Sequence, residues 1–186
     1  RVSHAVLDYL LRSAVTLAVY EPERLSFTSD SGFFSFPGSL ALSTRPRSVA
    51  EAEAWIRRIE GIPAYFEQQV AWLRRGLETG VVQPGYILPG VVGQIEALAS
   101  TPAEDSMLYT PLQNLPRQLP EGERLRLQVE ALAAIEQQAL PAYRGLLAFF
   151  LDEYQATPRE TLGISAVPDG RDYYRELVRY HTTRDM

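Results

Sequence analysis

Apolar side chains recur every three or four residues along most of this chain, and no segment shows the strict alternation typical of a half-buried strand. Such spacing places the apolar residues on one face of an amphipathic helix. The helices that it predicts cover 3–20, 48–61, 63–80, 89–99 and 121–154, and a short final one opens at Asp169-Gly170. We therefore expect an all-α protein, an irregular helical bundle.

Proline, glycine and serine mark where the helices are interrupted. Two long stretches rich in these residues, Leu25 to Arg47 and Thr101 to Pro120, lack a helical period and are expected to be irregular loops. The run from Ser48 to Glu51 has the form of a capping box that starts a helix. Ser3 is a second candidate N-cap. Pro141 is expected to kink or split the long helical segment around it, because it lacks an N–H group.

Composition excludes several kinds of chemistry. The 186 residues fit one helical domain over 1–186, and they include no cysteine, no lysine and only two histidines, His4 and His181. A disulfide framework, a thiolate nucleophile and a Schiff-base lysine are therefore impossible. A net charge of −5 argues against nucleic acid as a partner, and the longest apolar stretch is too short and too charged to span a membrane. No leader segment is visible, so the cellular compartment stays open.

Chemistry-bearing side chains gather near the end of the chain. The residues concerned are Tyr174, Tyr180, His181, Thr182 and Thr183. An imidazole and phenol hydroxyls can hold a substrate carbonyl or carboxylate, so these five are candidates for lining a substrate cleft. The alternative is that the tyrosines pack with their hydroxyls at the surface while His181 caps a helix C-terminus. Spacing alone favours this alternative, and no residue is assigned as catalytic or as a metal ligand.

The same tail carries a family resemblance. The stretch from Leu162 to Gly170, the Tyr173-Tyr174 pair and the run Arg179-Tyr-His-Thr-Thr183 followed by Asp185 resemble the bacterial "domain of unknown function 885" family. The paired helices of 48–80 and the Leu140-Pro-Ala-Tyr143 segment are also similar to that family, so the resemblance covers roughly the whole chain.

Members of that family look like mostly helical zinc metallopeptidases with a His-Glu-Ala-x-Pro-Gly-His motif downstream of the His-Thr-Thr run. The motif does not occur in this chain, so the resemblance implies no cofactor here and zinc only in a longer parent protein. It implies that the chain is the amino-terminal, non-catalytic helical part of that parent and helps to wall a substrate cleft. Its partners would then be the carboxy-terminal part and a peptide substrate. Asp185, a good N-cap with no helix after it, agrees with an interrupted chain.

Two other functions stay open. A stand-alone binding module would grip an apolar ligand or a partner helix with the aromatic residues Phe27, Phe33, Phe34, Phe36 and Tyr109, although these rings can equally well cover the core. A structural homo-oligomer would bury an apolar face that the chain leaves uncovered.

Overall fold

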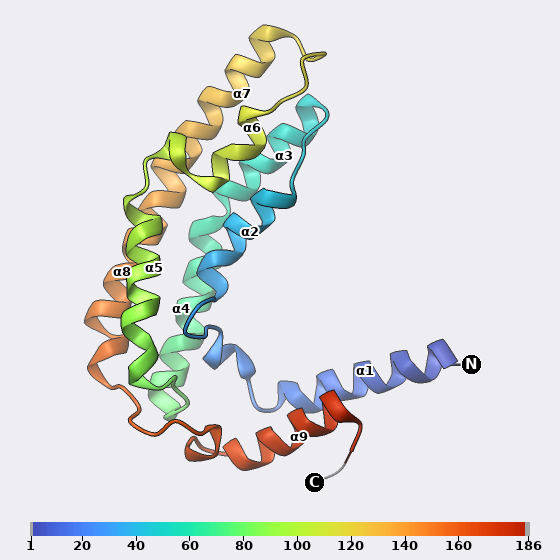
Figure 1. Cartoon of the computed structure of the whole chain (residues 1–186), viewed down its shortest axis with the longest axis vertical. Coiled ribbons are helices and arrows are strands. Elements are labelled where there is room, and N and C mark those ends of the chain that lie inside the picture. Colours follow the sequence, from blue (N-terminus) through green and yellow to red (C-terminus); the bar gives the residue numbers. More distant parts are fainter. Residues whose placement is uncertain (1, 185–186) are drawn as a thin grey trace.

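Five helices run along the long axis of the computed structural model, which describes residues 2–184 (Figure 1). These helices are α3 (Val49–Glu60), α4 (Ile62–Thr79), α5 (Leu88–Ser100), α7 (Glu121–Ala134) and α8 (Leu140–Asp152). Helix α3 lies beside α7 at one end, and α4, α5 and α8 lie together at the other. The most extensive helix pairs are α5 with α8 and α3 with α7, and α4 also packs on α8. The described part of the chain has two isolated β-bridges and no sheet. The prediction of an all-α bundle is therefore confirmed.

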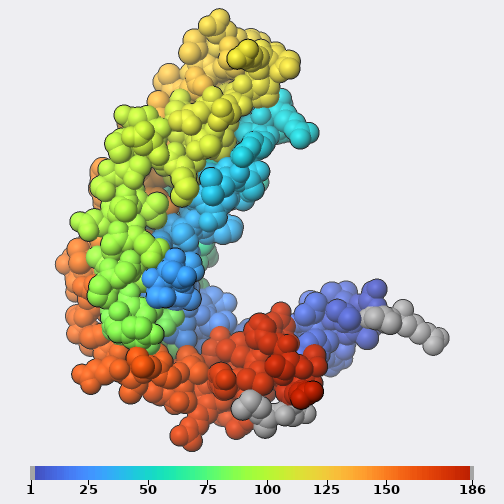
Figure 2. Space-filling view, in the orientation of Figure 1, coloured from blue at the N-terminus to red at the C-terminus, as the bar shows by residue number. Residues whose placement is uncertain are grey.

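Two further helices leave one end of this bundle together. They are α1 (Val2–Ala18) and α9 (Gly170–Thr182), from the two ends of the sequence, and they pack against each other. Figures 1 and 2 show them as an arm that projects sideways from the bundle, so that the molecule is bent and hollowed on its inner side. We call this pair the α1–α9 arm. Asp185, the predicted N-cap, lies outside the described residues.

The helix boundaries follow local backbone chemistry. The Ser48 hydroxyl accepts a hydrogen bond from the Glu51 N–H at 3.2 Å, and the Glu51 carboxylate accepts one from the Arg47 N–H. The predicted N-cap at Ser48 is confirmed, although the Glu51 side chain reaches Arg47 instead of Ser48 itself. Gly80 ends α4 with φ 73°, a left-handed conformation that glycine adopts without strain. Ser3 is not an N-cap, because α1 has already begun at residue 2.

Pro141 does not break the long helical segment into separate pieces. A π-helical turn, η6 (Ile135–Ala139), links α7 to α8, and the Leu140 N–H bonds to the Ile135 carbonyl. Pro141 then falls in the first turn of α8, where a missing N–H removes no hydrogen bond that the helix needs. The predicted irregularity is present, but as a widened turn just before the proline.

The two predicted loops are wrong in detail, because each contains short helices. The first includes η2 (Phe33–Ser35) and α2 (Phe36–Ser43), and the second includes η4 (Ala103–Asp105), η5 (Met107–Tyr109) and α6 (Thr110–Gln113). Several of them begin with a proline in the first turn, which fixes φ for a helix without an apolar period. Short helices of this kind take their stability from the surface that they cover.

Aromatic rings form the centre of the core. Phe27, Phe34, Phe66, Phe150 and Tyr154 are at most 3% exposed and meet their neighbours edge to face or at a tilt. Two polar groups of the core are paired across the chain. The Tyr143 hydroxyl donates to the Phe34 carbonyl at 2.9 Å, and the Trp55 indole N–H donates to the Leu108 carbonyl at 2.9 Å. In the described residues no helix is both long and apolar enough to cross a membrane.

The buried hydrogen bond of Tyr143 gives a test of this core. Replacing Tyr143 by Phe leaves the Phe34 carbonyl without its partner in a site that water does not reach, so the free energy of unfolding should fall by about 1–2 kcal/mol. Urea denaturation measures this change. The control is Tyr86→Phe, because Tyr86 is 70% exposed and should lose almost nothing. Equal losses in the two variants would show that the Tyr143 bond is not formed.

Candidate functional site

The five tail residues singled out from the sequence all lie on α9 or directly after it. Tyr180 is half-buried and faces α1, whereas Tyr174, His181, Thr182 and Thr183 are exposed. The His181 ring lies edge-on against the Tyr180 ring, with 4.8 Å between centroids. The structure therefore brings only Tyr180 of the predicted group into a cleft, and leaves the role of the other four as a prediction.

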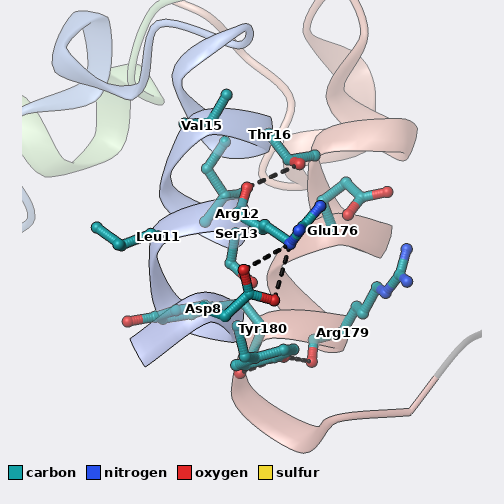
Figure 3. A pocket seen from close by; sticks show the side chains of 11 residues that line it. Asp8, Leu11, Arg12, Ser13, Val15, Thr16, Glu176, Arg179 and Tyr180 are labelled. Carbon is teal, nitrogen blue, oxygen red and sulfur yellow. Dashed lines mark hydrogen bonds and ion pairs between the residues drawn. The ribbon is translucent and has the colours of Figure 1, made fainter. Parts of the chain in front are cut away.

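The cleft lies between α1 and α9 and has a volume of about 680 Å³ (Figure 3). It is a groove along the α1–α9 arm, open to solvent, with both charged and apolar walls. The side chains that line it are Asp8, Tyr9, Leu11, Arg12, Ser13, Val15, Thr16, Leu17, Glu176, Arg179 and Tyr180.

The two walls of this cleft are joined by Tyr9. Its hydroxyl donates to the Arg179 carbonyl at 2.7 Å and to the Tyr180 carbonyl at 3.2 Å. The Arg179 carbonyl also accepts the Thr183 N–H, whereas the Tyr180 carbonyl lies in the last turn of α9 and gains a partner from a neighbouring element through Tyr9. At the other end of the arm, the rings of Tyr20 and Tyr173 are 5.4 Å apart.

Two of the charged groups of the cleft, both on α1, hold each other. Asp8 and Arg12 form an ion pair one turn apart on α1, with Nε to carboxylate distances of 2.8 and 2.9 Å. The hydrogen bond that Arg12 donates to Asp8 raises the pKa of Arg12, so this guanidinium stays charged at every pH of interest. The Thr16 hydroxyl donates to the Arg12 carbonyl at 3.0 Å. The cleft thus offers fixed charges and apolar surface for binding.

The two threonine hydroxyls at the end of α9 bond to backbone carbonyls of the same segment. Thr182 donates its hydroxyl to the Val178 carbonyl, and Thr183 donates to the Thr182 carbonyl, so neither hydroxyl is paired with a general base. Across residues 2–184, no group of three or more His, Asp or Glu side chains is placed to hold a metal ion. The arrangement can bind and position a ligand through its charged and apolar groups.

Thr183 has an unusual backbone conformation. Its φ is 60°, in the left-handed region that β-branched residues rarely adopt, and its N–H closes α9 by bonding to the Arg179 carbonyl at 2.8 Å. Helices usually end in this way with glycine. This strain could not be predicted from the residue pattern, since a threonine at such a position looks like any exposed polar residue.

The family-model comparison matches the whole chain. Residues 1–186 fit the family described as "Bacterial protein of unknown function (DUF885)". The chain belongs to the DUF885 family. No curated protein sequence is similar enough to count as a match.

A solved structure resembles the DUF885 chain in fold. It is the crystal structure of "the putative lipoprotein from Colwellia psychrerythraea", with a TM-score of 0.70 and 17% sequence identity. The match covers 78% of this chain but 25% of that one, so the chain corresponds to about a quarter of the longer protein. At this level of identity the likeness supports the fold alone.

Tyr9, Asp8 and Arg12 are among the cleft residues that the sequence did not single out as site candidates. They come from the first helix, and their only signal was a polar interruption in an otherwise apolar segment, with Asp8 and Arg12 one turn apart. That they face α9 depends on how the two ends of the DUF885 chain meet in space, which spacing along one helix does not show.

Most of the aromatic residues on which the binding-module hypothesis rests are not available to a ligand. Phe27, Phe33 and Phe34 are buried in the core, at 1%, 6% and 0% exposure, and Tyr109 is half-buried. Only Phe36 is open to solvent, at 56%. The rings of this segment are buried because they fill the space between α4 and α8. The alternative that these aromatic rings cover the core is therefore confirmed for Phe27, Phe33 and Phe34.

An ion-pair cluster fixes the elbow at which α1 leaves the bundle. The Arg75 guanidinium of α4 donates twice to the Glu21 carboxylate, at 2.6 and 2.7 Å, and Arg24 donates to the Tyr20 carbonyl and to the Thr79 hydroxyl, both at 2.8 Å. Glu21 itself has φ 47°, a strained conformation for a non-glycine residue. The hydrogen bonds from Arg75 lower the pKa of Glu21 below its ordinary value of 4.5.

The ion pair between Glu21 and Arg75 should make a pH-dependent contribution to the free energy of unfolding. A carboxylate with a lowered pKa stabilises the folded state above the pKa of the unfolded chain, and this contribution is lost as the pH falls through the lower folded value. Glu21→Gln should therefore be less stable than the wild-type chain at pH 7, and the difference should shrink as the pH falls below 4.5 and disappear once the pH is below the lowered pKa of Glu21. Urea denaturation at a series of pH values measures it. Glu67→Gln, an exposed change on α4, is the control and should track the wild type throughout.

Proposed function

We propose that this chain is a non-catalytic helical part of a larger zinc-dependent, peptidase-like protein of the DUF885 family, and that it forms one wall of a substrate cleft. The observation that carries the proposal is the uncovered apolar face of α1. Its exposed residues are Val6, Leu7, Leu10, Leu11 and Val15, with Val19 directly after the helix.

So many exposed apolar side chains along one helix are rare on the surface of a monomeric protein. Leu11 is 59% exposed and Val15 is 72% exposed, and no residue of 3–18 is buried. Contiguous apolar surface of this kind marks a place where another part of a protein packs. The share of the solved relative that the chain covers, 25%, supports a remainder large enough to cover it.

The zinc would belong to that remainder. The residues of this chain do not fit the ion, because the only two histidines, His4 and His181, lie at the ends of different helices and no third ligand joins them in the described part. The side of the cleft formed here would contribute binding alone, through Tyr180 and the charged and apolar groups beside it.

Metal content and activity test the proposal. The longer protein encoded by the same gene should contain about one zinc per chain and hydrolyse a casein or mixed-peptide substrate, whereas residues 1–186 alone should do neither. Plasma emission spectroscopy and a peptide-release assay give the two readouts. Stoichiometric zinc in the 186-residue chain, or a longer protein without zinc or hydrolysis, would contradict the proposal.

The uncovered face gives a second prediction. Leu11→Glu with Val15→Glu should leave the free energy of unfolding of residues 1–186 within about 0.5 kcal/mol of wild type, because both side chains already face solvent. In the longer protein the same pair should lower thermal stability clearly. The matched pair Glu67→Gln with Glu104→Gln, on exposed polar positions of the bundle, should affect neither protein.

A homo-oligomer is the second candidate, because a copy of the chain can also bury this face. Sedimentation velocity separates the two. A dimer of residues 1–186 that the Glu pair dissociates, with no effect of the pair in the longer protein, would favour self-association over the proposed remainder.

A further inference from the structure

A second cavity lies in the bundle, away from the α1–α9 arm. It has a volume of about 210 Å³ and opens where α2, the α3–α4 junction and η5 meet. Its walls are mainly apolar and aromatic. The lining residues are Phe36, Pro37, Leu40, Trp55, Arg58, Ile59, Gly61, Ile62, Tyr65 and Leu108.

The walls of this cavity are fixed before any ligand arrives. Trp55 is 2% exposed and is held by its hydrogen bond to Leu108, and Ile59 and Ile62 are at most 4% exposed. At the rim, the Phe36 and Tyr65 rings contact each other with centroids 6.4 Å apart. A preformed apolar pocket binds without paying for the ordering of its own side chains.

Arg58 is the charged residue in this lining. Its side chain is exposed, and no hydrogen bond or ion pair joins it to any of residues 2–184, whereas Arg74, Arg75 and Arg126 each hold a carboxylate. A guanidinium forms two parallel hydrogen bonds with a carboxylate. A free guanidinium at the mouth of an apolar cavity therefore complements a ligand with an apolar body and an acidic end.

We propose that this cavity binds an apolar carboxylate about the size of one aromatic ring, with the ring against Trp55 and the carboxylate on Arg58. The volume agrees with this size, since protein cavities of about 150 Å³ are known to hold benzene. A free aryl-alkanoic acid and the C-terminal aromatic residue of a peptide share this chemistry. The site is formed wholly by this chain, so it does not depend on the function proposed above.

Trp55 provides the readout. The chain has two tryptophans, and Trp72→Phe leaves Trp55 as the single indole. In this background, titration with 3-phenylpropionate should change the Trp55 emission in a saturable way, with a Kd of roughly 1 mM for so small a ligand. Saturation-transfer NMR of the ligand detects binding independently of the indole. N-acetyl-Ala-Ala-Phe, with a free carboxylate, tests the peptide source: tighter binding than 3-phenylpropionate assigns a peptide C-terminus, and binding of the acid alone assigns a free acid.

Two matched comparisons isolate the carboxylate contact. Arg58→Gln should weaken binding of 3-phenylpropionate about fivefold to tenfold, whereas Arg57→Gln, the adjacent exposed arginine outside the lining, should leave it unchanged. The neutral analogue 3-phenylpropionamide should bind the wild type and Arg58→Gln equally and weakly. Circular dichroism checks that each variant is folded. Absence of saturable binding by both readouts, equal affinity for acid and amide, or equal effects of the two arginine variants would overturn the proposal.

Discussion

The placement of the segment that joins α1 to the bundle decides the shape of this protein. Residues 25–35 are fixed in the core by side chains from distant parts of the chain: the Tyr143 hydroxyl binds the Phe34 carbonyl, and the Gln83 amide donates to the Leu25 and Phe27 carbonyls. A loop with buried carbonyls needs such partners, because an unpaired buried polar group is costly. Once this segment is fixed, the direction in which α1 leaves the bundle is fixed with it.

The same region also positions α9. The Gln83 N–H donates to the Tyr154 hydroxyl, and the Arg159 side chain donates to the Val82 and Gly163 carbonyls, so the segment that leads to α9 is tied to the one that follows α4. Burial raises the pKa of Tyr154 to about 12, so its hydroxyl stays neutral and can accept this bond at ordinary pH. Both ends of the chain thus leave the bundle from one connected group of hydrogen bonds.

The sequence predicted what depends on local pattern. Helical spacing predicted the long helices, and Ser48, Gly61 and Gly80 marked their ends, because capping acts over three or four residues. The aromatic segments gave no helical period, because their short helices are stabilised by rings that contact α4 and α8, far away in the sequence. The cleft was predicted only in part, because local pattern does not show which helices meet. Tyr180 was predicted from the cluster of polar and aromatic residues near the end of the chain. Tyr9 and Arg12 line the cleft only because the two ends of the chain pack together.

The α1–α9 arm buries too little surface to explain why its two helices stay folded and packed together. Among its described residues, only Gly170 is buried. The contacts that join its two sides include the Tyr9 hydrogen bonds and, just after α1, the Tyr20–Tyr173 ring contact. Ion pairs between exposed side chains, such as Asp8 with Arg12, contribute little to stability because water screens them. Isolated helices of this length are marginal in water, because backbone entropy opposes them. The arm therefore gains most of its stability when another protein surface packs on the exposed apolar face of α1. This requirement links the bent shape of the chain to its proposed place in a larger protein.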